Sequence, residues 1–324
     1  MDNFQDICIL FVFSLFLGGY WANMNTTPLR YPGGKSIMTP FFIDLMQANN
    51  LNGVTYAEPY SGGAGTATNL LLNNNVDRIL INDASICIYS FWRFLVEQNE
   101  RFIDTVLETP VNLENWRHFH NLVRTADQPS FDLGFATFFL SRTNRSGILT
   151  AGPIGGSTEE KQETANYKID CRFNKEDLIR RITAIGQHRN QIEVSNLDAI
   201  DFLRALAPGN NLVYLDPPYF EQGKSLYLNY YGIQDHQILA EFLSNAHNFE
   251  WILSYDNVEA IRNIYDNFEL YEFTINYTAQ RAKKGSELLT HSAGLIIPEG
   301  LEIRRKTGNI TLSKIIQDGT DREI

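Results

Sequence analysis

The stretch VTYAEPYSGGAGT (residues 54–66) decides the fold of this chain. Its apolar beginning, residues 54–59, predicts a buried strand that stops at a proline and a glycine-rich turn. A helix-like segment follows at residues 64–72. Glycines let the backbone turn tightly and approach a ligand without a Cβ clash, and the first N–H groups of a helix point at whatever binds there. The order strand, glycine-rich turn, helix is typical of a nucleotide-binding α/β unit.

The alternation of strand-like and helix-like segments continues on either side of a different stretch in the middle of the chain. Further strand-like runs are RILIND (78–83), QIEVSN (191–196), NLVYLD (211–216) and WILSYD (251–256). Helix-like segments occupy residues 85–98 and 235–245. This alternation predicts a mostly parallel sheet with crossover helices, an α/β fold. The segments at residues 268–279 and 286–297 resemble two adjacent strands and favour an antiparallel pair.

Length and composition limit the class of protein. The 324 residues are 44% hydrophobic and 20% charged, which suits a packed core and excludes a disordered or fibrous chain. Three scattered cysteines exclude a disulfide framework and a zinc cluster, and favour a reducing, cytoplasmic compartment. The net charge of −11, taken over the whole chain, argues against a polyanionic partner.

An uncharged apolar run occupies residues 7–22. It is shorter than the ~20 residues of a membrane span, and it lacks the preceding basic residues of a secretory signal. Met24 opens a segment that leads directly into the first motif. We therefore expect residues 1–23 to be a dispensable extension and the membrane not to be a partner, with a weak anchor or signal as the alternative.

Asp83 ends the strand-like run that follows the glycine-rich turn. It lies 18 residues after Gly65. This is close to the ~20-residue spacing at which an acid accepts hydrogen bonds from ribose hydroxyls in nucleotide folds. The glycines do not follow the pattern of dinucleotide sites, so a ligand such as S-adenosylmethionine fits as well. The structural alternative is a tight turn with a solvent-facing acid.

The segment LVYLDPPYF (212–220) carries the sharpest functional signal. Its two prolines fix φ and remove two N–H donors, so Asp216 and the Pro217 carbonyl are expected to face outward as acceptors. Such acceptors beside the Tyr219 ring suit a planar substrate with an exocyclic amine. They can accept hydrogen bonds from both N–H groups of the amine while the ring stacks on the base. The alternative is a Pro-Pro turn that merely ends a strand.

Taken in order, the motifs of the chain resemble those of DNA N6-adenine methyltransferases of the Dam-like type, over about residues 28–290. The matching segments are YPGGK (31–35) for the leading motif, EPYSGGAG (58–65) for the S-adenosylmethionine loop, ND (82–83) for the ribose-binding acid, FFLSRTNRSGI (138–148) for the hairpin segment, NLD (196–198) for the acid near the cofactor adenine, DPPY (216–219) for the catalytic motif and KKGSELL (283–289) for the late motif.

The resemblance implies methyl transfer from S-adenosylmethionine to N6 of an adenine that is flipped out of double-stranded DNA, with no metal. It implies that the catalytic residues are Asp216, Pro217, Pro218 and Tyr219. It implies cofactor contacts from Tyr31, Gly33, Gly34, Lys35, Glu58, Pro59, Ser61, Gly62, Gly63, Ala64, Gly65, Asp83 and Asp198. In this scheme Tyr31 and Lys35 hold the methionine end of the cofactor, Asp83 its ribose and Asp198 its adenine.

The resemblance also implies a domain organisation. We expect a Rossmann-like S-adenosylmethionine-dependent methyltransferase sheet in a catalytic domain at residues 24–98 and 174–300. An inserted, mainly helical target-recognition domain with a hairpin loop is expected at residues 99–173, and a tail at residues 301–324. We further expect a monomer, with a cognate restriction endonuclease as a candidate partner.

The distribution of charge supports a DNA partner better than the net charge does. Residues 140–189 contain nine basic and six acidic side chains, many of them near glycines. Mobile basic loops can follow phosphates and reach base edges. The candidate DNA contacts are Arg142, Asn144, Arg145, Arg281, Lys283 and Lys284. A solvated loop is the alternative for the region, and bracing of the hairpin is the alternative for Arg142.

Other functions stay open at this point. The same acceptor chemistry serves methylation of cytosine N4 or of adenine in RNA, although a leading lysine motif and a large insert favour adenine in DNA. A relative that binds DNA but has lost catalysis is an alternative of another class.

Overall fold

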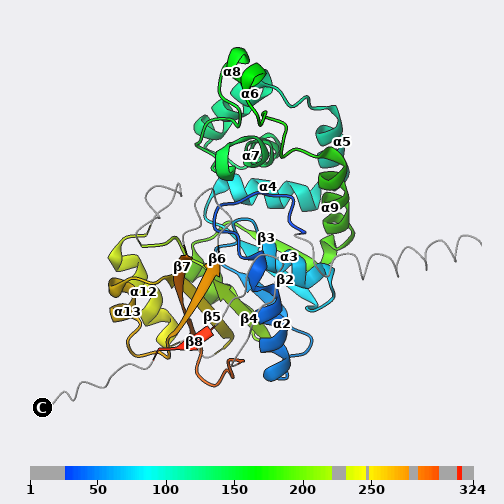
Figure 1. The fold of residues 1–324 in the computed structure, drawn as a ribbon. Helices are drawn as coiled ribbons and strands as arrows, with labels where there is room; N and C mark the ends of the chain where they lie inside the picture. The colour runs from blue at the N-terminus through cyan, green and yellow to red at the C-terminus, as the bar shows by residue number, and fades with distance from the viewer. Residues whose placement is uncertain (1–25, 221–230, 246–247, 277–283, 299–311, 316–324) are drawn as a thin grey trace, which may run out of the picture. The chain divides into compact units, whose positions relative to one another are not determined.

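The structure, a computed structural model, describes residues 26–220, 231–245, 248–276, 284–298 and 312–315 (Figure 1). The chain divides into two compact units. The first consists of Met1–Thr39 and Thr55–Phe202, and the second of Pro40–Val54 and Leu203–Ile324. Both units combine strands with helices. The prediction of a mixed α/β fold is confirmed.

Parallel strands in the order β3-β2-β1 form the sheet of the first unit. They are β1 (Thr55–Glu58), β2 (Arg78–Asn82) and β3 (Ile192–Ser195). Apolar side chains at Tyr56, Ala57, Ile79 and Ile81 are buried, as expected for strands covered on both faces. Because the strands are parallel, their carboxyl ends meet at one edge of the sheet. The residues that follow these strands therefore lie close together.

Helices make up most of the rest of the first unit. They are η1 (Ser36–Met38), α3 (Gly65–Leu72), α4 (Ile86–Glu97), α5 (Asn99–Glu108), α6 (Leu113–Thr125), α7 (Phe131–Thr143), η2 (Arg145–Gly147), α8 (Glu159–Thr164), α9 (Lys175–Gln187) and η3 (Arg189–Gln191). Side-chain caps at Asn112, Ser130 and Asn174 begin α6, α7 and α9. The helix α10 (Ala199–Ala205) spans the boundary between the units.

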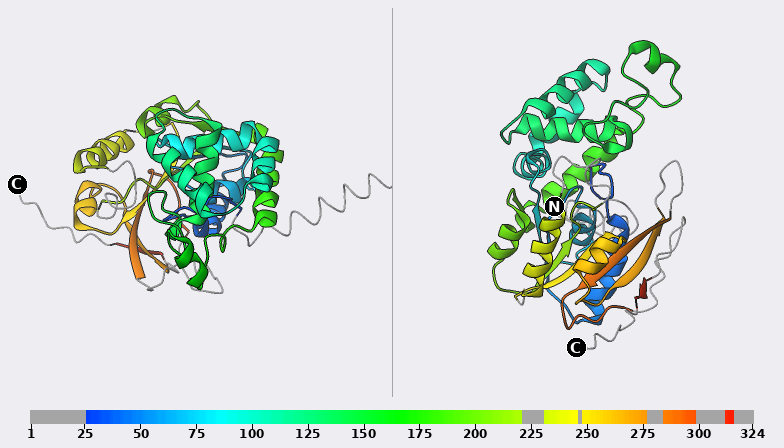
Figure 2. Two further views of the ribbon diagram at one scale, coloured as in Figure 1. Left: turned by 90° about the horizontal axis from the view of Figure 1, so that it is seen from above. Right: turned by 90° about the vertical axis from the view of Figure 1, so that its left-hand side faces the viewer.

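The helices between β2 and β3 pack against one another, as the cyan and green ribbons of Figure 2 show. Aromatic rings form part of this packing. The Phe102 ring lies 5.5 to 5.9 Å from the rings of Phe91, Phe131, Phe135 and Phe138. Most of these ring pairs are edge-to-face, a favourable geometry for aromatic groups. The stretch predicted as an insert, residues 99–173, is thus largely helical. It belongs to the same compact unit as β1, β2 and β3.

The second unit has its own strands. The strands β4 (Asn211–Leu215) and β5 (Glu250–Asp256) are parallel. The strand β7 (Lys284–His291) is antiparallel to β5 and to β6 (Tyr271–Asn276), and β8 (Leu312–Lys314) is antiparallel to β6. The predicted antiparallel pair is confirmed. The helices α2 (Thr39–Ala48), α12 (Ile233–Ser244) and α13 (Glu259–Ile264) complete the described part of this unit.

None of the helices within the described ranges is long and apolar enough to cross a membrane. The apolar run at residues 7–22 lies outside those ranges.

Candidate functional site

The glycine-rich turn connects β1 to α3 in the first unit. Gly62 has a φ of +44°. A Cβ on Gly62 would lie 2.6 Å from Cε1 of the Tyr31 ring. Glycine is therefore needed at this position for two reasons, the left-handed backbone and the contact with the ring. Trp92 also holds the turn, since its Nε1 donates a hydrogen bond to the Gly62 carbonyl at 2.9 Å.

The leading motif at residues 31–35 lies against this turn. Lys35 is buried, with its Nζ donating to the Gly33 carbonyl at 3.2 Å. The Lys35 carbonyl accepts a hydrogen bond from Thr66 Oγ1 in α3 at 2.8 Å. A Cβ on Gly65 would lie 3.0 Å from the Ser36 Cβ. The structure thus brings the first two predicted motifs together around the start of α3.

Glu58, the last residue of β1, has a buried carboxylate. Its Oε1 accepts a hydrogen bond from the Ala67 N–H in α3 at 3.1 Å. An anion near a helix N-terminus is stabilised by the free N–H groups and the helix dipole. The side chain therefore holds the beginning of α3 against the end of β1.

The Asp83 carboxylate lies at the carboxyl edge of the sheet and faces the glycine-rich turn. It accepts hydrogen bonds from the Gly62 and Ser85 N–H groups, both at 2.9 Å. Burial raises the pKa of Asp83 to about 6, although these two N–H groups act in the opposite direction. Above a pH of about 6 the ionised Asp83 carboxylate can therefore accept hydrogen bonds from hydroxyl groups.

Asp198 follows β3, the neighbour of β2. Its side chain is exposed, and its Oδ1 accepts a hydrogen bond from the Ile200 N–H at the start of α10 (2.9 Å). Leu197, just before it, is 42% exposed. Two carboxylates and an exposed apolar side chain therefore follow adjacent strands at one edge.

Asn82 links these segments from inside the sheet, and the motif analysis did not give it a role. It is 1% exposed, and its side chain bonds to the chain after β1 and to the chain after β3. The signal available in the sequence was an amide at the end of an otherwise apolar buried strand.

The tetrapeptide at residues 216–219 follows β4 in the second unit. Asp216 Oδ1 accepts a hydrogen bond from Ser254 Oγ in β5 at 3.0 Å. Ser254 Oγ also lies 2.8 Å from the Tyr214 hydroxyl. Because a serine has one hydroxyl hydrogen and donates it to Asp216, the Tyr214 hydroxyl is the donor to Ser254. This chain of hydrogen bonds orients the Asp216 carboxylate, and Ser254 is a second residue that the motif analysis missed.

A buried histidine lies beside the residue that follows the tetrapeptide. The His236 ring centroid is 5.7 Å from that of Phe220, and His236 Nδ1 is 2.8 Å from the Tyr255 hydroxyl. Burial lowers the pKa of His236, which favours the neutral ring. The Phe220 N–H donates to Asp256 Oδ1 at 3.1 Å. These contacts fix the chain just after Tyr219.

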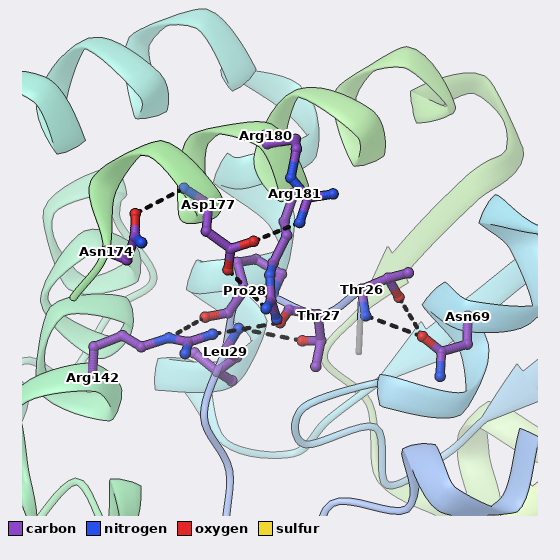
Figure 3. A network of polar contacts seen from close by, with 10 residues as sticks. All are labelled: Thr26, Thr27, Pro28, Leu29, Asn69, Arg142, Asn174, Asp177, Arg180 and Arg181. Carbon is purple, nitrogen blue, oxygen red and sulfur yellow. Dashed lines mark hydrogen bonds and ion pairs between the residues drawn. The ribbon is translucent and has the colours of Figure 1, made fainter. Parts of the chain in front are cut away.

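Arg142 does not point to solvent as a DNA contact would (Figure 3). Its Nε donates to the Pro28 carbonyl at 2.6 Å. The neighbouring Arg181 donates to the Thr27 carbonyl at 3.0 Å and pairs with Asp177 at 2.7 Å. Burial, reinforced by nearby Arg181, lowers the pKa of Arg142 to about 9. The assignment of Arg142 to DNA is therefore not supported, because the guanidinium braces the segment before the leading motif.

Asn144 is also turned inward, against the expectation that it reads a base edge. It is 0% exposed. Its Oδ1 accepts a hydrogen bond from Trp116 Nε1 at 2.6 Å, and its Nδ2 donates to the carbonyls of Ile148 and Leu149 at 2.9 and 3.0 Å. Both amide N–H groups are used within the loop. Asn144 shapes the hairpin, and its assignment as a base contact is not supported.

Arg145 is exposed, in agreement with a surface role. The adjoining loop is closed by an antiparallel bridge between Asn144 and Pro153 and by a hydrogen bond from the Arg145 N–H to the Gly152 carbonyl at 3.1 Å. Further exposed basic residues of the same region are Lys161, Lys168 and Arg172. Arg281 and Lys283 lie outside the described residues, and of Lys284 only the backbone, paired with Asn276, is described.

In the part of the chain that the structure describes, His, Cys, Asp and Glu side chains form no group of three or more that could hold a metal ion.

Comparisons with known proteins agree with these motifs. The model of the D12 class N6 adenine-specific DNA methyltransferase family matches residues 31–279. The Type II methyltransferase M.CviBI of Paramecium bursaria Chlorella virus NC1A is 21% identical over 270 residues, which cover 81% of this chain and 95% of the viral protein. Among solved structures, the protein LPL1258 of Legionella pneumophila str. Philadelphia 1 matches 81% of this chain and 86% of its own, at 11% identity and a TM-score of 0.28.

Proposed function

The chain belongs to the D12 class N6 adenine-specific DNA methyltransferase family, and on this premise we propose that it transfers the methyl group of S-adenosylmethionine to N6 of a flipped-out adenine at a specific site in double-stranded DNA. The family match covers most of the chain, from the leading motif to the strand β6.

The carboxyl edge of the first unit fits S-adenosylmethionine by the chemistry of its groups. Ribose hydroxyls and an adenine amine are hydrogen-bond donors, and Asp83 and Asp198 are acceptors that follow the adjacent strands β2 and β3. The exposed Leu197 side chain suits the face of a purine ring. The Lys35 segment and the glycine-rich turn, which Tyr31 covers, suit the methionine end. When bound, the cofactor supplies an electrophilic methyl group.

The remaining cofactor contacts proposed from the motifs are backbone or structural groups of the same region. They are Gly33, Gly34, Glu58, Pro59, Ser61, Gly62, Gly63, Ala64 and Gly65. Of these, Glu58 acts by holding the start of α3, as its buried hydrogen bond to Ala67 indicates.

The tetrapeptide of the second unit provides the acceptors for the target amine. In the proposed reaction Asp216 and the Pro217 carbonyl accept hydrogen bonds from the two N–H groups of the adenine amine, which aims the nitrogen lone pair toward the methyl group. The N6–methyl bond would form as the sulfur–methyl bond of the cofactor breaks, S-adenosylhomocysteine would leave, and N6 would lose one proton, for which the Asp216 carboxylate is the proposed acceptor. Ser254 keeps the Asp216 carboxylate in one orientation through its 3.0 Å hydrogen bond. Pro218 keeps the turn rigid, and Tyr219 stacks on the flipped base.

Exposed basic side chains of the region at residues 140–189 are proposed to contact the DNA backbone. Arg145, Lys161, Lys168 and Arg172 are exposed, whereas Arg142 and Asn144 are used inside the protein. We also propose a monomer that needs no metal. A cognate restriction endonuclease is a candidate partner, because the viral relative is a type II methyltransferase.

The observation that carries the proposal is the Asp216 carboxylate, which follows a buried strand and is oriented by a buried serine. The test is to incubate purified protein with double-stranded DNA and S-adenosylmethionine, digest the DNA to nucleosides and identify the product by mass spectrometry. N6-methyl-2′-deoxyadenosine that is lost with D216A supports the proposal. N4-methyl-2′-deoxycytidine, or no methylated deoxynucleoside at all, would overturn it. In a parallel reaction with RNA in place of DNA, N6-methyladenosine without any DNA product would favour the RNA alternative.

A further inference from the structure

Asn82 uses the full hydrogen-bonding capacity of its amide to join the ends of adjacent strands. Its Nδ2 donates to the carbonyls of Pro59 and Leu197, both at 3.0 Å. Its Oδ1 accepts from Ser195 Oγ and from the Leu197 N–H, both at 2.8 Å. A primary amide has two N–H donors and two acceptor lone pairs, so all four are satisfied. The side chain is 1% exposed.

The segments that Asn82 joins are those that carry the proposed cofactor contacts. Pro59 leads into the glycine-rich turn, and Leu197 directly precedes Asp198. The Asn82 carbonyl also accepts a hydrogen bond from the Ser61 N–H at 2.9 Å.

The residue after Asn82 is tied into the same arrangement. The Asp83 carbonyl accepts a hydrogen bond from Asn196 Nδ2 at 2.7 Å, and the Asp83 N–H donates to the Ser195 carbonyl at 3.3 Å. The Asp83 carboxylate accepts from the Gly62 N–H. One buried side chain and its neighbour therefore fix the glycine-rich turn, Asp83 and the chain before Asp198 relative to one another.

We propose that Asn82 is a positioning residue for the cofactor, which sets the spacing between the acceptor for the ribose, Asp83, and the acceptor for the adenine, Asp198. The inference rests on the proposed use of this edge for S-adenosylmethionine. Binding groups must be held close to their productive geometry by a supporting set of hydrogen bonds. No other side chain of this size donates twice and accepts twice. Aspartate has the same shape, but it would place an oxygen against the carbonyls of Pro59 and Leu197.

The test is the isosteric variant N82D with N99D as a matched control. Asn99 is also buried in the first unit, and its Nδ2 donates to the carbonyls of Leu95 and Ile182, both at 3.0 Å. The same atomic change therefore sets an oxygen against two carbonyl oxygens at each site, and both variants lose stability. Asn99 lies between helices and not at the carboxyl edge of the sheet.

The measurements are the Kd for S-adenosylmethionine by calorimetry, the Tm, and the kcat and KM values for cofactor and DNA. We expect N82D to raise the Kd and the KM for cofactor at least about tenfold, with kcat at saturating cofactor and the KM for DNA within about threefold of wild type. N99D lowers the Tm with the Kd within about twofold. Equal loss of Tm in both variants with unchanged Kd would overturn the proposal.

If N82D does not fold, the Kd of S195A for S-adenosylmethionine provides the test. This variant removes only one of the four hydrogen bonds of the Asn82 side chain. A rise of about threefold in the Kd supports the positioning role, and an unchanged Kd contradicts it. Wild-type protein that does not bind S-adenosylmethionine refutes the proposed function itself, and with it this inference. Wild-type binding that N82D or S195A leaves intact refutes the inference alone.

Discussion

Replacement of Ser254 by alanine tests how the Asp216 carboxylate is held. The substitution removes the hydroxyl that donates to Asp216 at 3.0 Å and that lies 2.8 Å from the Tyr214 hydroxyl. A hydrogen bond to a charged group contributes about 1.5 to 3 kcal/mol. If this energy is needed to orient Asp216 in the transition state, S254A lowers kcat about ten- to a hundredfold.

The double variant S254A/Y214F separates catalysis from stability. In S254A the Tyr214 hydroxyl, in a side chain that is 2% exposed, loses its Ser254 partner, which costs about 1 to 3 kcal/mol of unfolding free energy. Adding Y214F removes that hydroxyl, so part of the stability returns while kcat stays low. Initial rates at saturating DNA and cofactor give kcat, and calorimetry gives the stability. A folded S254A protein with kcat within twofold of wild type would refute the reasoning.

Further expectations concern the first unit. R142Q is expected to lower the Tm but to leave the salt dependence of DNA binding unchanged, because Arg142 bonds to the Pro28 carbonyl. R145Q should reduce the slope of log K against log salt by about 1. Burial raises the pKa of Asp83 to about 6, so its contribution to the unfolding free energy falls as the pH rises from about 4 to about 6, and D83N should flatten this dependence in pH-dependent melts. The same titration should weaken cofactor binding as the pH falls below about 6, because the protonated acid is a poorer acceptor for ribose hydroxyls. G62A places a Cβ 2.6 Å from the Tyr31 ring and should raise the cofactor Kd more than about tenfold, so unchanged calorimetric binding would contradict that placement.

Local patterns in the sequence were enough to predict the positions of the strands. The apolar run at residues 54–59 ends at a turn and contains β1. The apolar run at residues 211–216 ends at an acid and contains β4. The glycine-rich turn could be foreseen because it depends on neighbouring residues. The contact between this turn and the Tyr31 ring could be seen only in the structure. The family resemblance had already implied that the leading motif and the glycine-rich turn bind the same cofactor.

Partners that are distant in the sequence explain what the motif analysis missed. Arg142 was a candidate DNA contact because the region is basic, with bracing of the hairpin as the alternative, and the carbonyl it bonds to is 114 residues away. Asn82 and Ser254 have partners up to 115 and 40 residues away, respectively, and the sequence gives no direct sign of these contacts. Charge and composition can indicate which region faces DNA, whereas the direction of each side chain depends on tertiary packing.

The most direct measurement is methylation-sensitive long-read sequencing of DNA from a host that expresses the wild-type protein or D216A. We expect N6-methyladenine at one defined sequence with the wild-type protein and none with D216A. N4-methylcytosine, or an adenine signal that D216A leaves unchanged, would contradict the account.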